Sequence, residues 1–284
     1  MAGRDLEEAV ARAMGSAVRS SRAVAGGDIN DAHEMALADG RSVFVKSNFG
    51  ADPTMFAAEA RGLAWLAQAR ALRVPEVLAV GDTFLVLESI SPARRRPDFD
   101  ERLGRGLAVL HRFGAPGFGL DHDNFIGRLP QSNAPASTWP DFYRSRRLEP
   151  QLRLARNAGL CSSAMARGFD RLFAVLDERV GPAESPARLH GDLWGGNLIV
   201  DETGAGCLID PAVHGGHREV DLAMMRLFGG FGPRVFAAYE EAWPLHPGHQ
   251  ERVPLYQLYF LMVHVNLFGG PYVAQAEHAL RAVA

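Results

Sequence analysis

The spacing of apolar positions predicts a strand-rich first part of the chain. Charged and apolar residues at helical spacing over 4–14 predict a short helix, and Ala38-Asp39-Gly40-Arg41 is a turn of the kind that joins hairpin strands. A helix is expected to open near Asp52-Pro53 and to run to about residue 69, since proline is well placed in a first helical turn. Strands are predicted on either side of the Gly26-Gly27 turn and at 42–46, 77–80 and 84–87.

After Ile90 the pattern becomes helical. Residues 91–97 form a Pro-flanked basic break, and Leu103, Leu107 and Leu110 then mark one stripe of a helix over 99–113. Residues 114–140 are dense in Gly, Pro, Asn and Asp and are expected to be loops; helices follow at 141–158, 162–180 and from 219 onward, with short strands at 198–200 and 207–209. The sequence therefore predicts a bilobal α+β fold, with a small antiparallel β-rich lobe at 1–88 and a larger α-helical lobe at 89–284.

Composition narrows the class of protein. The 284 residues are 47% hydrophobic and 22% charged, which is typical of a globular chain. No apolar run is long enough for a membrane span, and residues 1–20 are charged throughout, so we expect neither a membrane segment nor a signal peptide. A net charge of −3 argues against a nucleic-acid partner. With only Cys161 and Cys207, no disulfide framework is expected, and a cytoplasmic location is predicted.

One segment carries a catalytic spacing. Residues 190–197 read His-Gly-Asp-Leu-Trp-Gly-Gly-Asn, and H-x-D-x4-N is the spacing of a kinase catalytic loop. In that loop the aspartate, here Asp192, accepts a hydroxyl proton, and the asparagine, here Asn197, holds Mg²⁺. Asp210 follows thirteen residues later, after a predicted hairpin that should return the chain beside its start. Carboxylate and amide oxygens suit Mg²⁺, so Asn197 and Asp210 are the predicted metal ligands. The alternative without a catalytic role is a glycine-rich turn with an aspartate cap.

The lysine content points to a second part of the same site. Of 30 Lys and Arg residues only Lys46 is lysine, and it ends the strand at 42–46. An ammonium is a compact point charge, unlike the planar guanidinium, so its use here suggests a specific task. Glu59 lies thirteen residues on, inside the predicted helix, where a kinase places the partner of its phosphate-binding lysine. Gly26 and Gly27 would let backbone N–H groups approach phosphates, although a Gly-Gly pair alone is more often a plain turn.

The segment between the predicted lobes completes the nucleotide site. Glu88, Ser89 and Ile90 run from the last predicted strand into the lobe boundary, and the backbone of this hinge would bind adenine. Glu88 is equally well explained as an ordinary solvated charge. Asp210 is followed by Pro211-Ala212 rather than Phe-Gly, which argues against a regulated protein kinase. A Walker-type phosphate loop is absent from the sequence, and this excludes the P-loop class.

On these residues the chain resembles the fructosamine kinase (ketosamine-3-kinase) family, which belongs with the aminoglycoside-phosphotransferase-like kinases and their protein-kinase-like fold. The resemblance runs from about residue 20 to the C-terminus. It is carried by Gly26–Asn30, Val43–Lys46, Asp123–Gly127, Gln131–Asn133, Arg147–Gln151, His190–Asn197, Ile209–Ala212 and Gly216–Met224. Family members use ATP and Mg²⁺ to phosphorylate the 3-hydroxyl of ketoamines, which form when sugars glycate amines. The product breaks down and frees the amine, so the resemblance implies a deglycation repair activity.

The resemblance leaves the acceptor open between several candidates. It implies a fructosamine or ribulosamine, free or protein-bound, with an aminoglycoside or another small alcohol as the alternative within the same fold. A pseudokinase binding module is disfavoured, because Lys46, Asp192 and Asn197 are all present. Trp194 is expected to stack on the sugar in the acceptor pocket, or else to be a core residue that sets the loop. The blocks at 123–127 and 147–151 are expected to help build that pocket.

Overall fold

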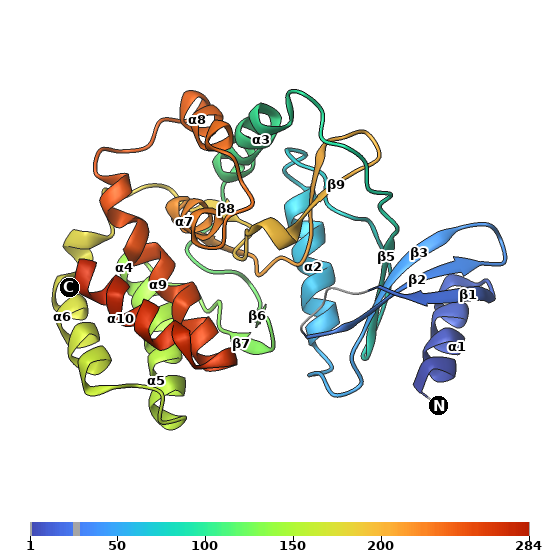
Figure 1. Cartoon of the computed structure of the whole chain (residues 1–284), viewed down its shortest axis with the longest axis horizontal. Helices are drawn as coiled ribbons and strands as arrows, with labels where there is room; N and C mark the ends of the chain where they lie inside the picture. The colour runs from blue at the N-terminus through green and yellow to red at the C-terminus, as the bar shows by residue number, and fades with distance from the viewer. Residues whose placement is uncertain (1, 25–28, 284) are drawn as a thin grey trace. The chain divides into compact units, whose positions relative to one another are not determined.

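A computed structural model describes residues 2–24 and 29–283, which form two compact units (Figure 1). The first unit holds the described residues up to Phe99 together with Leu198–Pro211. The second holds Asp100–Asn197 and the described residues from Ala212 onward. These units differ from the predicted lobes in where they place 89–99 and 198–211, and the division at residue 88 stays a prediction about functional lobes. Gly26 and Gly27 lie outside the described residues.

The first unit is built on a five-stranded antiparallel sheet. The elements are α1 (Ala2–Met14), β1 (Val18–Ala23), β2 (Asp31–Leu37), β3 (Ser42–Ser47), α2 (Met55–Ala67), β4 (Val77–Gly81), β5 (Phe84–Glu88), β9 (Leu198–Val200) and β10 (Gly206–Leu208). The strand order in the sheet is β1-β2-β3-β5-β4, and a separate two-stranded ladder joins β9 to β10.

Alternation along β3 explains why two helices flank this sheet. Successive side chains of a strand point to opposite faces. Val43 and Val45 are fully buried and pack in one cluster with Val10 of α1. Phe44, between them, packs against the cluster that α2 contributes to. Lys46 shares the face of Phe44, so the period of the strand carries the lysine to the side covered by α2 (Figure 1).

The β9–β10 hairpin joins the first unit through backbone hydrogen bonds. The Ala93 N–H donates to the Val200 carbonyl at 3.2 Å, and the Arg96 N–H donates to the Gly204 carbonyl at the same distance. On the other strand, the Leu208 N–H donates to the Arg73 carbonyl at 2.8 Å. The hairpin therefore lies between two segments of the N-terminal part of the chain, which explains why it belongs to this unit.

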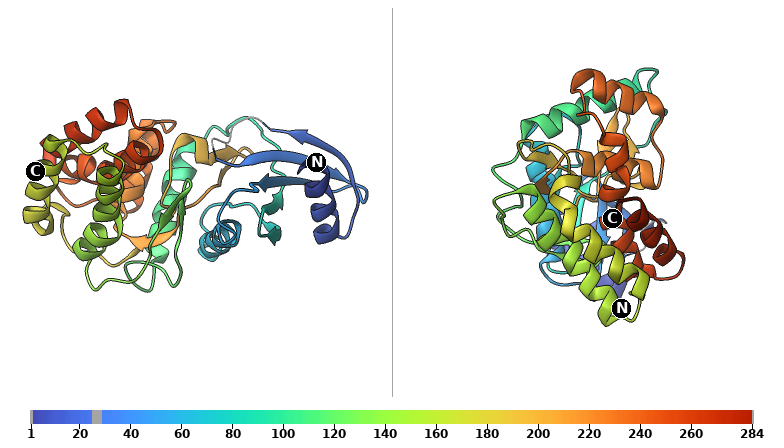
Figure 2. Two further views of the ribbon diagram at one scale, coloured as in Figure 1. Left: turned by 90° about the horizontal axis from the view of Figure 1, so that it is seen from below. Right: turned by 90° about the vertical axis from the view of Figure 1, so that its left-hand side faces the viewer.

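The second unit is mostly helical. Its elements are α3 (Phe99–Phe113), β6 (Asn124–Ile126), β7 (Leu129–Gln131), α4 (Trp139–Phe142), the π-helical turn η1 (Tyr143–Leu148), α5 (Glu149–Asn157), α6 (Ser163–Arg179), β8 (Ala187–Leu189), the 3₁₀ turn η2 (Gly195–Asn197), β11 (His214–Gly216), α7 (Glu219–Leu227), α8 (Pro233–Ala242), α9 (His249–Phe268) and α10 (Pro271–Val283). Its last helix, α10, packs on α9 and α6, and α9 also packs on α7 and α5 (Figure 2).

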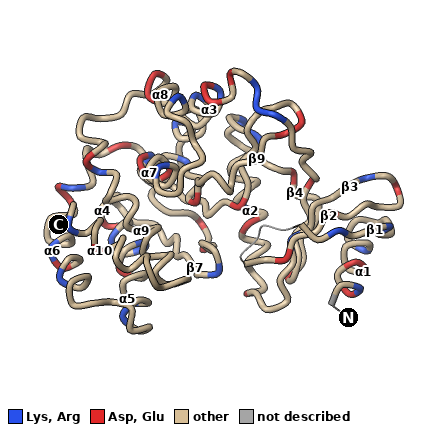
Figure 3. The backbone as a smooth tube through the Cα atoms, viewed as in Figure 1, with Lys and Arg blue, Asp and Glu red and all other residues tan. Residues whose placement is uncertain are grey.

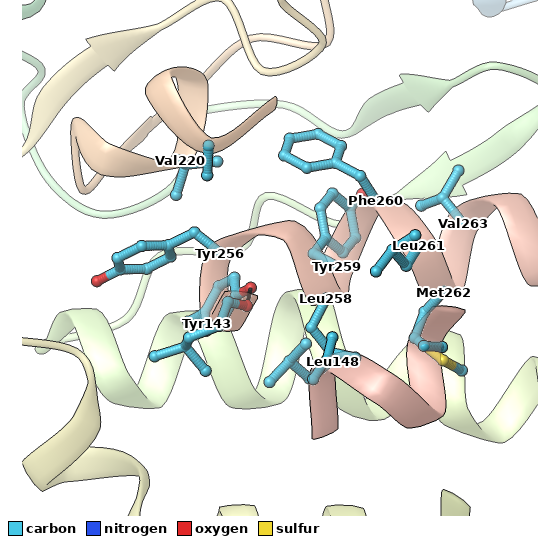
Figure 4. Packing of buried hydrophobic residues seen from close by; sticks show 14 of the residues in the cluster. Tyr143, Leu148, Val220, Tyr256, Leu258, Tyr259, Phe260, Leu261, Met262 and Val263 are labelled. Carbon is cyan, nitrogen blue, oxygen red and sulfur yellow. Dashed lines mark hydrogen bonds between the residues drawn. The ribbon is translucent and has the colours of Figure 1, made fainter. Parts of the chain in front are cut away.

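Helix α9 is the centre of the core of this unit. It carries no Lys, Arg, Asp or Glu after Arg252 (Figure 3), and from Leu255 to Val263 all but Gln257 is buried. Tyr256 and Tyr259 pack there with Tyr143 and Leu148 of the preceding helices (Figure 4). Burial on nearly all sides explains why the helix lacks a polar stripe. Within residues 2–24 and 29–283, no helix is long and apolar enough to cross a membrane.

The α+β class is confirmed, and the predicted elements differ from the structure mainly at 114–158. The expected loop at 114–140 contains the three-residue strands β6 and β7, and the expected helix at 141–158 is α4, η1 and α5 in succession. Strands of three residues are too short for a two-residue period to appear. The π-helical turn is a local widening that apolar spacing does not encode.

Candidate active site

The predicted catalytic loop lies in the second unit, between β8 and η2. The Asn197 side-chain amide nitrogen donates to the Asp192 carbonyl at 2.8 Å and to its carboxylate at 3.1 Å. Because both hydrogen bonds use the nitrogen, the amide is oriented, and its oxygen is the atom that a cation would meet. Asp192 and Asn197 are thus brought together as a pair, in the relation that the H-x-D-x4-N spacing predicts.

A buried aspartate on α7 holds the start of this loop. The Asp221 carboxylate accepts the N–H groups of His190 at 2.8 Å and Gly191 at 2.9 Å. It also pairs with His111 at 3.1 Å, and the other ring nitrogen of His111 lies 2.9 Å from the Tyr239 hydroxyl. Burial alone would raise the pKa of Asp221, but the hydrogen bonds from His111 and the loop hold that pKa below its usual range.

Sequence reasoning missed this role of Asp221. A position in the first turn of a helix is typical of a residue that caps it, but the N-cap of α7 is Arg218, and the Asp221 side chain bonds to the catalytic loop instead. Its partners lie about 30 and 110 residues away in sequence, so no local pattern could have indicated the contact. His111, at the end of an apolar stripe, has a positioning contact here through the same carboxylate.

Glycine is required inside the His-Gly-Asp segment. Gly191 has a φ of +83°, and a Cβ placed on it would lie 2.0 Å from the Ala212 carbonyl oxygen. The Ala212 N–H in turn donates to the His190 carbonyl at 2.9 Å. Any side chain at 191 would push the loop away from the Ala212 peptide, and this explains the residue between His190 and Asp192.

The predicted Lys46–Glu59 ion pair is present in the first unit. The Lys46 ammonium lies 2.6 Å from the Glu59 carboxylate, with both side chains almost fully buried, and it also pairs with the Asp210 carboxylate. Burial alone would lower the pKa of Lys46, but the two carboxylates raise it above its usual value. The lysine is therefore held as a cation between two acidic groups.

Asp210 has an unusual backbone. Its φ of +55° is one of two positive values found among the described non-glycine residues, and aspartate tolerates this region better than most residues. Its side chain is 43% exposed, so the carboxylate is open to solvent in part. The chain enters β9 directly from Asn197, and Leu198 pairs with Leu208, two residues before Asp210. Asn197 and Asp210 belong to different units, so their joint metal site stays a prediction.

Two of the predicted hinge residues, Glu88 and Ser89, are held by hydrogen bonds and an ion pair within the first unit. The Glu88 N–H donates to the Glu76 carbonyl at 2.9 Å, and the Glu88 carboxylate pairs with Arg73 at 3.3 Å. The Ser89 hydroxyl lies 3.3 Å from the Glu34 carboxylate. Glu88 is thus neither a freely solvated charge nor a donor with an open N–H. The binding of adenine by Glu88, Ser89 and Ile90 stays a prediction.

Trp194 lies on the surface two residues after Asp192. It is 39% exposed, which rules out the alternative of a core residue, and its ring meets Phe228 edge-on at 6.3 Å. A Cβ on Gly196 would lie 2.3 Å from the indole ring, so the glycine gives the tryptophan its place. A role for Trp194 in binding the sugar stays a prediction that this exposure permits.

Three polar side chains of the 123–127 and 147–151 blocks are buried. Asn124, Arg147 and Gln151 are each at most 4% exposed, as are Gln131 and Asn133 of the block at 131–133. The expectation that the 123–127 and 147–151 blocks help to build the acceptor pocket is therefore not met by Asn124, Arg147 and Gln151. Polar residues that resemble a family motif need not touch its substrate, because buried amides and guanidinium groups also serve to fix backbone.

Comparison with known proteins agrees with the motif. The family model described as fructosamine kinase matches residues 4–284. The chain is 39% identical to the probable ketoamine kinase of Synechocystis, over 93% of this chain and 90% of the relative. It is 38% identical to the chloroplastic protein-ribulosamine 3-kinase of Arabidopsis thaliana, over 89% of this chain and 79% of the relative.

Solved structures show the same relationship. A crystal structure from Thermobifida fusca, assigned as a fructosamine-3-kinase, superposes with a TM-score of 0.91 at 39% identity and covers 98% of both chains. A macrolide 2'-phosphotransferase shares the fold alone, with a TM-score of 0.67 at 17% identity over 98% of this chain and 96% of the other. The observed α+β architecture is thus that of the aminoglycoside-phosphotransferase-like kinases.

Proposed function

The chain belongs to the fructosamine kinase family, and on that premise we propose that it transfers the terminal phosphoryl group of ATP to the 3-hydroxyl of a sugar-derived ketoamine. The reaction is that of a kinase with an alcohol acceptor. The observation that carries the proposal is the hydrogen-bonded Asp192–Asn197 pair on a loop with the H-x-D-x4-N spacing. Release of the amine from the phosphorylated product would make this a deglycation activity.

Asp192 is the proposed catalytic residue. A carboxylate can orient the attacking hydroxyl and accept its proton, and phosphoryl transfer depends mainly on such positioning and on charge neutralisation. Asp221 supports this role, because its bonds to the His190 and Gly191 N–H groups fix the backbone directly before Asp192. The acceptor alcohol would therefore meet a carboxylate, Asp192, whose preceding backbone is fixed by a buried residue of the second unit.

Lys46 is the proposed phosphate-binding cation, and Glu59 is the residue that holds it. The ammonium is almost buried, so its attraction for phosphate oxygens is weakly screened by solvent. Gly26 and Gly27 are proposed to approach the phosphates with backbone N–H groups, and Glu88, Ser89 and Ile90 to bind adenine.

The donor set fits a magnesium ion. Glu59 and Asp210 place two carboxylates on the single ammonium of Lys46, which leaves negative charge that a divalent cation would balance. Asp210 and the Asn197 amide oxygen are hard oxygen ligands of the type that Mg²⁺ prefers. We propose that these two residues hold the ion. When bound, Mg²⁺ would neutralise charge on the phosphate oxygens.

The names of the relatives support a ketoamine acceptor. A ketoamine kinase and a protein-ribulosamine 3-kinase match most of this chain at 39% and 38% identity, whereas the macrolide phosphotransferase shares only the fold. An aminoglycoside carries several ammonium groups and generally needs a strongly acidic pocket. Trp194, exposed beside Asp192, instead offers an apolar face to sugar carbons. Fructosamine and ribulosamine, free or protein-bound, are the proposed acceptors.

The experiment is an acceptor panel. The full chain is incubated with ATP and Mg²⁺ and with ribuloselysine, fructoselysine, a glycated peptide, kanamycin or choline, and the phosphate position is determined by ³¹P and ¹H NMR. Phosphate on the 3-hydroxyl of a ketoamine is the expected result. Turnover of kanamycin without turnover of any ketoamine would refute the proposal and favour the aminoglycoside alternative.

A further inference from the structure

Within the described residues, a fully buried arginine of the second unit has no carboxylate among its hydrogen-bond partners, although the Asp123 carboxylate acts on it through space. Arg147, in η1, is 1% exposed, and among the described residues its hydrogen-bond acceptors are the carbonyls of Ser132 and Arg146 and the amide oxygen of Asn133. Its guanidinium carbon lies 4.6 Å from the centre of the Phe142 ring, and its Nε–H has no hydrogen-bond partner in the described parts of the chain. Burial lowers the pKa of Arg147 to about 10.

Burying such a charge is costly, so its retention calls for an explanation. Arginine has five N–H donors and no acceptor. The Asn133 side chain must therefore turn its oxygen toward Arg147, where the two atoms lie 2.7 Å apart. The Asn133 nitrogen then faces the other way and donates to the Asn124 amide oxygen at 2.9 Å and to the His122 carbonyl at 3.1 Å. An amide has nearly the same shape when flipped, and the guanidinium and the His122 carbonyl together set which way this one points.

The order of donors and acceptors set at Asn133 continues through two further amides to the backbone. The Asn124 oxygen accepts a second bond from the Gln131 nitrogen at 2.8 Å, so the Asn124 nitrogen is left to donate to the Val213 carbonyl at 2.9 Å. The Gln131 nitrogen also donates to the Ala212 carbonyl at 3.2 Å. Its oxygen accepts the Tyr259 hydroxyl proton at 2.5 Å, which fixes the direction of Gln131 from the α9 side.

One of the two carbonyls at the end of this network, that of Ala212, lies against the catalytic loop. The Ala212 N–H donates to the His190 carbonyl at 2.9 Å, and Gly191 packs so closely that a Cβ would lie 2.0 Å from the Ala212 oxygen. A flipped Gln131 amide would put its oxygen against the Ala212 carbonyl oxygen, and a flipped Asn124 amide would do the same at Val213. The peptide that supports His190 and Gly191 would then shift, and the loop with Asp192 would shift with it.

We propose that Arg147 and Tyr259 are positioning residues for the catalytic loop. Arg147 orients Asn133 and, through it, Asn124, while the Tyr259 hydroxyl orients Gln131, and these amides fix the backbone on which the His190–Asp192 segment rests. Both side chains are buried and act through the amides, whereas Asp221 bonds directly to the loop. The inference rests on the proposed function of Asp192 but not on the identity of the acceptor.

The test uses variants of the full chain with matched changes. Tyr259→Phe removes the hydroxyl that orients Gln131 and keeps the ring. Tyr256→Phe is the control: Tyr256 lies one turn earlier on α9, is fully buried, and donates its hydroxyl to the Val180 carbonyl, outside the network (Figure 4). Tyr259→Phe should lower kcat roughly 5- to 10-fold, the value of about one lost hydrogen bond, with KM for ATP unchanged. Tyr256→Phe should leave kcat within twofold.

A stronger variant and a second readout complete the test. Arg147→Met should lower kcat about 100-fold, the cost of misplacing a catalytic group by about 1 Å. Hydrogen exchange measured by mass spectrometry should show faster exchange at 188–192 and 210–214 in Tyr259→Phe but not in Tyr256→Phe. Should Arg147→Met fail to fold, the comparison of Tyr259→Phe with Tyr256→Phe still tests whether the amide network positions the loop.

The outcomes separate the two proposals. Equal kcat and equal exchange in the two tyrosine variants would overturn the positioning role of the amide network that Arg147 and Tyr259 orient. Absence of ketoamine turnover by the unaltered chain would overturn the proposed function, and the exchange comparison, which needs no substrate, would still test the network. Faster exchange throughout the second unit in both variants would mean a general loss of stability and would also count against the proposal.

Discussion

Single residues in this chain are held by unusually complete sets of partners. Asp192 is bonded to Asn197, and Lys46 is held between Glu59 and Asp210. A substitution in each set tests one step of the proposed reaction, because it replaces a functional group while the volume of the side chain stays nearly the same.

Asp192→Asn removes the proton acceptor and keeps the size of the side chain. Turnover should fall about 100- to 10 000-fold, the usual contribution of a general base, while ATP still binds, since the nucleotide residues are unchanged. Steady-state kinetics and calorimetric titration of ATP would measure the two effects. Asp170→Asn, an exposed position on α6, is the matched control and should behave as the unaltered chain. Near-normal turnover in Asp192→Asn would remove this residue from the mechanism.

Lys46→Arg tests whether a charge alone is enough. The guanidinium is larger and planar, and it would have to fit a buried site built for an ammonium 2.6 Å from Glu59. We expect kcat/KM for ATP to fall at least 10-fold, measured with the acceptor saturating. Arg41→Lys, the reverse exchange at an exposed ion pair with Asp39, serves as the control. Full activity of Lys46→Arg would show that the only lysine of the chain has no task specific to an ammonium.

Elements show where sequence reasoning succeeds. The two-residue period of β3 carries Lys46 to the face covered by α2, so the thirteen-residue spacing to Glu59 predicted a contact that the structure contains. The catalytic loop could also be predicted from the sequence, because its functional residues lie within eight consecutive positions.

The contacts that were not predicted join distant elements. Asp221 of α7 holds His190, 31 residues before it, and Arg147 of η1 acts on Asn133 and beyond it on the Ala212 peptide. The residue types indicate a family resemblance but do not indicate where each polar side chain points. Whether a polar side chain points into a pocket or into the core depends on packing that a single sequence does not encode.

The β9–β10 hairpin offers a prediction at the scale of an element. The Asp201 carboxylate accepts hydrogen bonds from the Thr203 and Ala205 N–H groups, at 2.9 and 3.0 Å, and from Arg73 at 3.0 Å. Burial alone would raise the pKa of Asp201, but these bonds lower it to about 2 from 3.8. A lowered folded-state pKa stabilises the fold above the unfolded-state pKa and ceases to do so as the pH falls through the folded value.

Asp201→Asn should therefore destabilise the first unit by about 2 kcal/mol near neutral pH. The difference in unfolding free energy between the two proteins should stay level above pH 5 and shrink between about pH 4 and pH 2. Urea unfolding at a series of pH values would measure it. Asp82→Asn, in the turn between β4 and β5 of the same unit, is the control. A difference that does not vary with pH would show that the carboxylate charge is not what stabilises the hairpin.

At the scale of the whole molecule, ligand binding links the sites to stability. Only the folded chain can bind ATP with Mg²⁺, so at 100 times Kd the ligand should add about 2.7 kcal/mol and raise the Tm by roughly 5 °C. Asp192→Asn should show the same rise in Tm, because it lacks a proton acceptor and not a phosphate-binding group.

Lys46→Arg, and the unaltered chain with EDTA, should show a smaller rise in Tm. Adenosine, which lacks phosphates, gives the part of the rise that is independent of Lys46 and the metal, so it should stabilise the unaltered chain and Lys46→Arg equally. Differential scanning fluorimetry would measure all of these shifts, and an equal rise with ATP in Lys46→Arg and the unaltered chain would contradict the assignment of Lys46 to the phosphates.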